Sequence, residues 1–169
     1  MRRPCLAKSY KLDPPAKDLR ETTIDQLTYP LDDRQHRFPM PAGGLFSTAE
    51  DVSKFCRMIL NGGTLNGKRY ISPASLHEMT STQNHGMGGS NYGLGWGISD
   101  SGFGHGGALK NSMEINPAKG RILIFMVQQS GPWGTADGDA IGSRLARFAD
   151  DLTARSTTIP KSGETLNRH

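Results

Sequence analysis

Glycine is concentrated in one stretch of this chain, and that stretch restricts the structures that the backbone can form there. Fifteen of the 21 glycines lie between Gly43 and Gly107. Glycine lacks a Cβ, so it allows backbone conformations that other residues avoid and lets a second segment or a ligand approach closely. We therefore expect tight turns and close backbone contacts to be concentrated in this region.

The glycine-rich stretch ends around a histidine, His105, whose neighbours are Gly104, Gly106 and Gly107. The charge of an imidazole changes near pH 7, and glycine neighbours leave the adjacent N–H groups accessible. This combination suits a substrate-binding wall or an edge that stabilises an anion. A tight turn that carries an exposed histidine accounts for the same residues.

Capping signals and apolar spacing predict three helices. The first begins with a capping box in which Ser47 accepts from the Glu50 N–H, and it ends at Asn61-Gly62-Gly63. The second follows Ser72-Pro73 and covers about 74–80. The third covers about 139–153. The first helix carries a stripe made of Val52, Phe55, Cys56, Ile59 and Leu60, and the third carries one made of Ile141, Leu145, Phe148, Ala149 and Leu152.

Three strands are predicted in the second half of the chain. Residues 92–98 alternate large apolar side chains with glycine, which is typical of a strand with one bare face. A second strand covers 109–116. The third covers 121–129, and its continuous apolar run predicts a central strand that is covered on both faces. Asn66-Gly67 is typical of a tight turn.

Composition and spacing argue against several classes of function. The net charge is +4 and the pI is about 9.2, but no basic stripe with interleaved aromatic residues suggests nucleic-acid binding. No apolar run is long enough for a membrane span.

Motifs for a metal or another cofactor are also absent from the sequence. Cys5 and Cys56 do not form a CxxC pair and the five histidines show no HExxH spacing, so neither a metal nor another cofactor is predicted. A phosphate-loop pattern ends in Lys68, but Arg69 replaces the required Ser or Thr. The compartment is not assigned.

The usual serine-nucleophile motifs are absent from the sequence. No G-x-S-x-G elbow occurs. The chain also contains no S-x-x-K, Y-x-N or S-x-N.

An ordered series of segments nevertheless resembles the C-terminal half of a serine beta-lactamase-related protein, a group that includes class C beta-lactamases, D-alanyl-D-alanine carboxypeptidases and esterases. The series consists of residues 41–52, 60–63, 92–97 and 103–108. The resemblance implies an α+β fold in which a short antiparallel sheet is covered by helices, as part of a beta-lactamase or penicillin-binding-protein-like fold.

In that family the active site joins S-x-x-K, Y-x-N or S-x-N, and K-T-G or a variant on the sheet's edge strand. Only the third has a counterpart here, at His105-Gly106-Gly107. The resemblance implies that His105 replaces the lysine, that Gly106 and Gly107 contact substrate, and that the Ala108 N–H serves the oxyanion hole. Gly106 stands where the family has Thr, which favours esters or small amides over beta-lactams. The other two motifs are expected in a portion that precedes Met1 in a longer relative.

These observations predict an extended wrapping segment at 1–41, the C-terminal part of a beta-lactamase-like domain at 42–154 and a polar tail at 155–169. We expect part of a serine hydrolase that acts on small acyl, ester or peptide substrates and is inactive alone. Strand 121–129 is expected to have an uncovered edge, which favours self-association or a complementing N-terminal half. Two alternatives remain: a non-catalytic binding module that uses the glycine-rich groove at 92–108, and a hydrolase that uses an unrecognised serine.

Overall fold

The computed structural model describes residues 6–13, 18–23, 35–36, 45–85, 89–134, 138 and 140–157. Much of the predicted wrapping segment, residue 139 and residues 158–169 of the predicted tail lie outside the described residues. The chain divides into two compact units, Met1–Pro132 and Trp133–His169. Each unit is described by itself.

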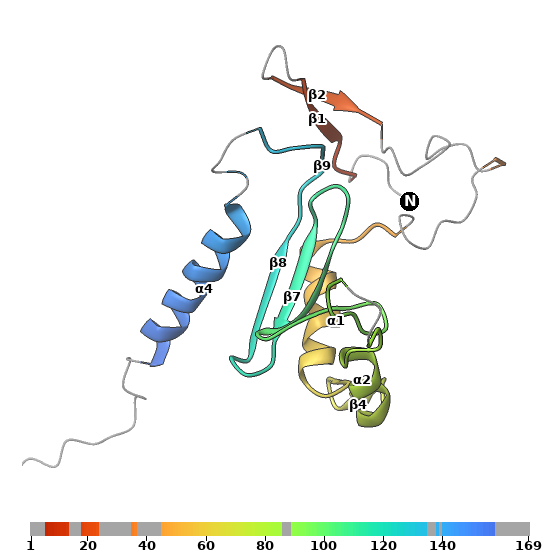
Figure 1. Ribbon diagram of the computed structural model, residues 1–169, viewed down its shortest axis with the longest axis vertical. Helices are drawn as coiled ribbons and strands as arrows, with labels where there is room; N and C mark the ends of the chain where they lie inside the picture. The colour runs from red at the N-terminus through yellow and green to blue at the C-terminus, as the bar shows by residue number, and fades with distance from the viewer. Residues whose placement is uncertain are drawn as a thin grey trace, which may run out of the picture. The chain divides into compact units, whose positions relative to one another are not determined.

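The first unit is built around an antiparallel sheet of four strands in the order β5-β6-β7-β8. Figure 1 labels the last two of these strands, which run side by side in front of helix α1 (Ala49–Leu60). The strands are β5 (Gly97–Ser99), β6 (Gly102–Gly106), β7 (Ser112–Asn116) and β8 (Arg121–Phe125). Phe103 pairs with Ile115, and Ile115 pairs with Ile122. Directly paired residues share a face, so these three side chains point to the same side of the sheet.

Helix α1 packs on that apolar face, against β7 and β8. Cys56 and Ile59 of the predicted stripe are buried in the core, while Phe55 stays 39% exposed and stacks on Trp96 with ring centroids 6.0 Å apart. Trp96 also meets Phe103 edge-on at 5.2 Å. The α+β prediction is therefore confirmed: a short antiparallel sheet shares one core with a covering helix.

The predicted capping box is wrong by one residue. Thr48 is the N-cap, and its side-chain oxygen accepts from the Asp51 N–H at 3.2 Å. The Ser47 hydroxyl instead donates to the Thr48 carbonyl oxygen, with the two oxygens 3.5 Å apart. Glu50 lies 3.5 Å from the Lys54 Nζ, in an ion pair along the helix surface. Thr48 therefore caps the helix, with a β-region backbone typical of an N-cap.

Local turn and cap signals after α1 are confirmed. Asn61 caps the helix, and Gly62 and Gly63 follow at positive φ. Strands β3 (Thr64–Leu65) and β4 (Lys68–Arg69) form a hairpin across Asn66-Gly67, where both residues have positive φ as a type I′ turn requires. Helix α2 (Pro73–Thr80) is capped by the Ser72 hydroxyl, which accepts from the Ser75 N–H at 3.0 Å.

The predicted strand at 92–98 is wrong over most of its length. Only its last two residues belong to β5, and an isolated bridge between Tyr92 and Gly97 closes a tight turn. Gly95 has φ +84, which interrupts an extended backbone, and Leu94 is 56% exposed. The Leu94 N–H donates to the Met79 carbonyl at 3.0 Å, which ties this turn to the end of α2.

The predicted strand at 121–129 is split into two. After β8, strand β9 (Gln129–Ser130) pairs in parallel with β1 (Ser9–Asp13), which also forms an antiparallel hairpin with β2 (Asp18–Thr22). Within the described strands, β8 stands at the end of its sheet rather than in the centre. The central position predicted from its apolar run is therefore wrong for this sheet. The β1–β2 hairpin was not predicted.

The second unit contains α4 (Ile141–Thr157), which begins close to the predicted start and extends four residues beyond the predicted end at 153. Three residues of the predicted stripe, Ile141, Leu145 and Ala149, are partly buried, whereas Phe148 and Leu152 are 62% and 48% exposed. Among the described residues, no helix combines the length and apolar character that a membrane span requires.

Candidate functional site

The predicted site residues lie at the end of β6 and in the turn that follows it. His105 and Gly106 are the last two residues of this strand, and both are exposed. On one side β6 pairs with β7 through His105–Met113 and Gly106–Ser112. On the other side β5 reaches only as far as Gly104. β6 is thus the second strand of the sheet, and the predicted edge position is wrong. Within the described structure, however, His105 and Gly106 pair with β7 only, because β5 ends before it reaches them.

The open side of β6 presents backbone polar groups of Gly106. The Gly107 N–H donates to the Asn111 carbonyl at 2.7 Å, so the backbone of Gly107 faces β7. In an antiparallel pair, hydrogen-bonding direction alternates along the strand. Gly106 therefore directs its N–H and C=O away from β7, toward the side that β5 leaves open.

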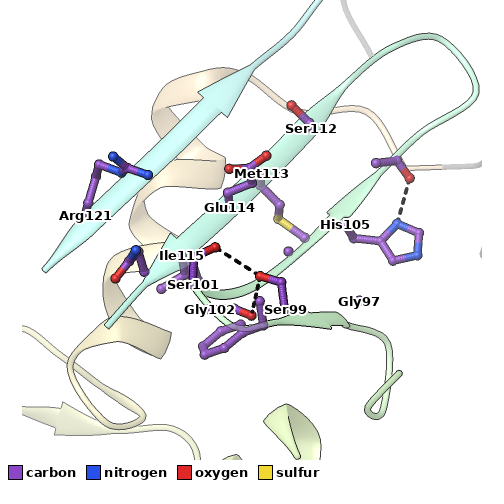
Figure 2. A pocket seen from close by; sticks show the side chains of 14 residues that line it. Gly97, Ser99, Ser101, Gly102, His105, Ser112, Met113, Glu114, Ile115 and Arg121 are labelled. Atoms are coloured by element: carbon purple, nitrogen blue, oxygen red, sulfur yellow. Dashed lines mark hydrogen bonds between the residues drawn. The ribbon is translucent and has the colours of Figure 1, made fainter. Parts of the chain in front are cut away.

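The His105 ring is fixed by a hydrogen bond to the neighbouring backbone. Its Nδ1 lies 2.7 Å from the Gly106 carbonyl oxygen (Figure 2). A carbonyl oxygen only accepts, so Nδ1 must carry the proton in this contact. The ring also meets Tyr92 edge-on, with centroids 5.9 Å apart and planes at 81°.

Ala108 lies directly after this strand end, in the turn that joins β6 to β7. The Lys110 N–H donates to the Gly107 carbonyl at 2.9 Å and closes the turn. Lys110 has φ +61, a conformation that few non-glycine residues adopt. Ala108 is exposed, and no hydrogen bond from its N–H is found within the described residues.

A pocket of about 380 Å³ follows the glycines of β6 on the sheet face opposite α1 (Figure 2). Gly104 and Gly106 contribute bare backbone, and Glu114 and Ser112 are their partners on β7. The remaining polar lining comes from His105, Ser99, Ser101, Asn116 and Arg121. This surface is an open depression in which polar side chains lie beside bare glycine backbone.

The described serines near a histidine or in the pocket do not form a catalytic dyad. The Ser81 Oγ lies 3.4 Å from the His77 Nε2, but it donates to the His77 carbonyl at 2.7 Å. In the pocket, the Ser99 and Ser101 hydroxyls lie 3.1 Å apart, and Ser99 also donates to the Gly102 carbonyl. Neither arrangement is a dyad, and Ser112, which also lines the pocket, has no histidine partner among the described contacts. The alternative of an unrecognised serine nucleophile stays a prediction.

Shifted pKa values lie away from the β6 strand end. A hydrogen bond from Lys54 lowers the pKa of the Asp51 carboxyl, and the same contact raises the pKa of Lys54. Burial raises the pKa of the Cys56 thiol. No group of three or more His, Cys, Asp or Glu side chains within the described residues has the arrangement of a metal site.

Sequence reasoning did not identify Tyr92 as a neighbour of His105. Tyr92 was interpreted as part of a regular strand, whereas the structure places it in the turn before β5. Tyr92 forms a bridge with Gly97, and Gly97 pairs with Gly104 of β6. These two pairings bring the Tyr92 ring close to His105. The alternation of apolar residues and glycine over 92–98 does not indicate such a contact.

Comparison with known proteins gives one family and two curated relatives. The family model described as "Beta-lactamase" matches residues 6–147. "Uncharacterized protein MT1414" of Mycobacterium tuberculosis (strain CDC 1551 / Oshkosh) is 37% identical over 88 residues, which cover 48% of this chain and 20% of that protein. "Protein Rv1367c" of Mycobacterium tuberculosis (strain ATCC 25618 / H37Rv) gives the same identity and coverage. The aligned stretch thus spans about a fifth of the length of these relatives.

Proposed function

Because the chain belongs to the beta-lactamase family, we propose that it supplies one wall of a serine hydrolase site that cleaves small esters or amides. The observation that carries the proposal is the open end of β6. There, a histidine whose ring is held by the Gly106 carbonyl lies beside backbone that β5 leaves unpaired. A second segment has to supply the serine, because the sequence contains no S-x-x-K.

In this proposal each residue has a separate role. With its proton on Nδ1, a neutral His105 has a lone pair on Nε2 and can accept a proton there. The Ala108 N–H stabilises the oxyanion that forms when the serine attacks a carbonyl. Gly106 and Gly107 let the substrate lie against the main chain, and the absence of a Thr hydroxyl at Gly106 supports an ester or small amide over a beta-lactam.

The chain alone is expected to show negligible hydrolysis. A binding wall and an oxyanion donor without the nucleophile retain only a small part of the rate enhancement of a complete site. The test is incubation of the purified chain with a fluorophosphonate and with a p-nitrophenyl ester. Rapid stoichiometric labelling of a serine would contradict the proposal.

A positive test joins the chain to a segment that carries the other two motifs. The gene that encodes the chain is sequenced on the upstream side, and any in-frame S-x-x-K and Y-x-N segment found there is expressed together with residues 1–169. We expect this longer protein to hydrolyse the ester and to lose about 10²–10⁴-fold in kcat when His105→Ala is introduced. Ala108→Pro, which removes the N–H, should lower kcat about 10²–10³-fold. Ala108→Ser retains the N–H and is the matched control.

The pocket favours a second candidate function, a non-catalytic binding module that uses the glycine-rich groove. Its volume of about 380 Å³ is within the range of small-ligand sites. Boronic acids and short acyl esters distinguish the two functions. A serine adduct on the longer protein supports the hydrolase. Reversible binding to the chain alone, abolished by Gly106→Val, supports the binding module, because a Cβ at Gly106 would meet only the Asn111 carbonyl oxygen, at 3.6 Å.

A further inference from the structure

The orientation of the His105 ring depends on two contacts that act in different ways. The hydrogen bond from Nδ1 to the Gly106 carbonyl, at 2.7 Å, selects the Nδ1–H tautomer of the neutral ring. The edge-on contact with the Tyr92 ring, at 5.9 Å between centroids, limits how far the imidazole can rotate away from that carbonyl. An exposed histidine without such contacts samples several rotamers and both tautomers.

Tyr92 is itself held in place by its backbone. Its N–H donates to the Asn84 side-chain oxygen at 2.8 Å, and its carbonyl accepts from the Gln83 N–H at 2.7 Å. The Asn84 side chain is fixed in turn by donation to the Ser90 carbonyl at 2.9 Å. The bridge to Gly97 ties the same residue to β5. The Tyr92 backbone is therefore anchored both to the residues after α2 and to the sheet.

We propose that Tyr92 is a positioning residue for His105. Its ring keeps the imidazole bonded to Gly106 through Nδ1, so that Nε2 is the nitrogen left with a lone pair. The importance of this arrangement for proton transfer rests on the proposed function, but the arrangement itself is a property of this chain. The contact is between the two rings, and no hydrogen bond from the Tyr92 hydroxyl to His105 is found within the described residues.

Nitrogen NMR of the ¹⁵N-histidine-labelled full chain tests the proposal. His105 is assigned with His105→Gln, and long-range ¹H–¹⁵N correlations identify which ring nitrogen carries the proton in the neutral form. We expect the Nδ1–H form to dominate in the wild type. Tyr92→Leu should shift the ratio several-fold toward Nε2–H, the form favoured by free histidine.

Matched variants separate positioning from general destabilisation. Tyr92→Phe keeps the ring and should keep the wild-type ratio. Tyr70→Leu removes an exposed tyrosine that directly follows β4 and lies under Lys68, and it should also leave the ratio unchanged. A contact between ring protons of Tyr92 and His105 in the wild-type NOE spectrum provides a test that needs no variant. An unaltered ratio in folded Tyr92→Leu, or absence of that NOE, would overturn the proposal.

The outcome is independent of whether the hydrolase proposal is right. If the tautomer ratio responds to Tyr92→Leu but the longer protein does not hydrolyse esters, the positioning role stands and the proposed function fails. If the longer protein is active but the ratio does not change, the positioning role fails and the hydrolase remains.

Discussion

At the scale of single residues, Gly62 and Gly63 form a natural pair for testing how the chain leaves α1. Both have positive φ, at +67 and +87. A Cβ at Gly62 would meet nothing within 4 Å, whereas one at Gly63 would lie 2.2 Å from the Ile71 carbonyl oxygen. Gly62→Ala should therefore lower the free energy of unfolding by about 1–2 kcal/mol through backbone strain alone. Gly63→Ala should lower it further, because backbone must also move.

Urea denaturation of the two variants beside the wild type measures this difference. Equal destabilisation would show that the close approach between Gly63 and Ile71 does not form.

Cys56 gives a second prediction at this scale. Its side chain is fully buried in the core, 3.9 Å from the sulfur of Met113, and burial raises the pKa of its thiol. The thiolate is the reactive form, so alkylation of Cys56 by iodoacetamide at pH 8 should be slow in the native chain and fast in urea. Peptide mass mapping follows this residue separately from Cys5. Rapid native modification of Cys56 would mean that the core around it opens readily.

At the scale of an element, the start of α1 is specified by one hydroxyl. Thr48 accepts from the Asp51 N–H, and the neighbouring Ser47 makes no such contact. Thr48→Ala should lower the free energy of unfolding by about 1 kcal/mol, because a helix N–H loses its partner. Ser47→Ala is the matched control and should have little effect. The reverse order in thermal denaturation would restore the capping box predicted from the sequence.

The same helix shows why some elements were predictable and others were not. Caps, the Asn66-Gly67 turn and the apolar spacing of α1 are signals within a few residues, and the structure confirms their elements within one or two positions. The turn before β5 depends instead on contacts with Met79 and on burial of Trp96, which lie outside any short window. The β1–β9 pair joins segments more than a hundred residues apart, so no local pattern indicates it.

The candidate site divides in the same way. The sequence shows a single histidine among glycines, and His105 and Gly106 do form the end of β6. The length of β5 cannot be predicted from the sequence, although it determines which residues of β6 stay unpaired on that side. The contact between Tyr92 and His105 likewise depends on how the turn folds back on the sheet.

At the scale of the whole molecule, the first unit combines parts with very different burial. Cys56, Ile59 and Ile115 are fully buried where α1 meets the sheet. In contrast, four of the five residues of β2 are exposed, and this strand pairs only with β1 among the described strands. Free energies of local opening follow such differences, since few buried contacts are lost when an exposed hairpin separates.

Hydrogen exchange followed by mass spectrometry should therefore resolve two rates of opening in native buffer. Amides of α1 and β7 share one core and should exchange last and together. Amides in the β1–β2 hairpin should exchange first, even though β1 is paired on both sides. Ile115→Ala, which removes a core side chain and should cost about 2–5 kcal/mol, ought to speed exchange in α1 and β7 and leave the hairpin almost unchanged. If the hairpin and the core instead accelerate equally, the hairpin opens only with the core, and β1 is an integral part of the same cooperative structure.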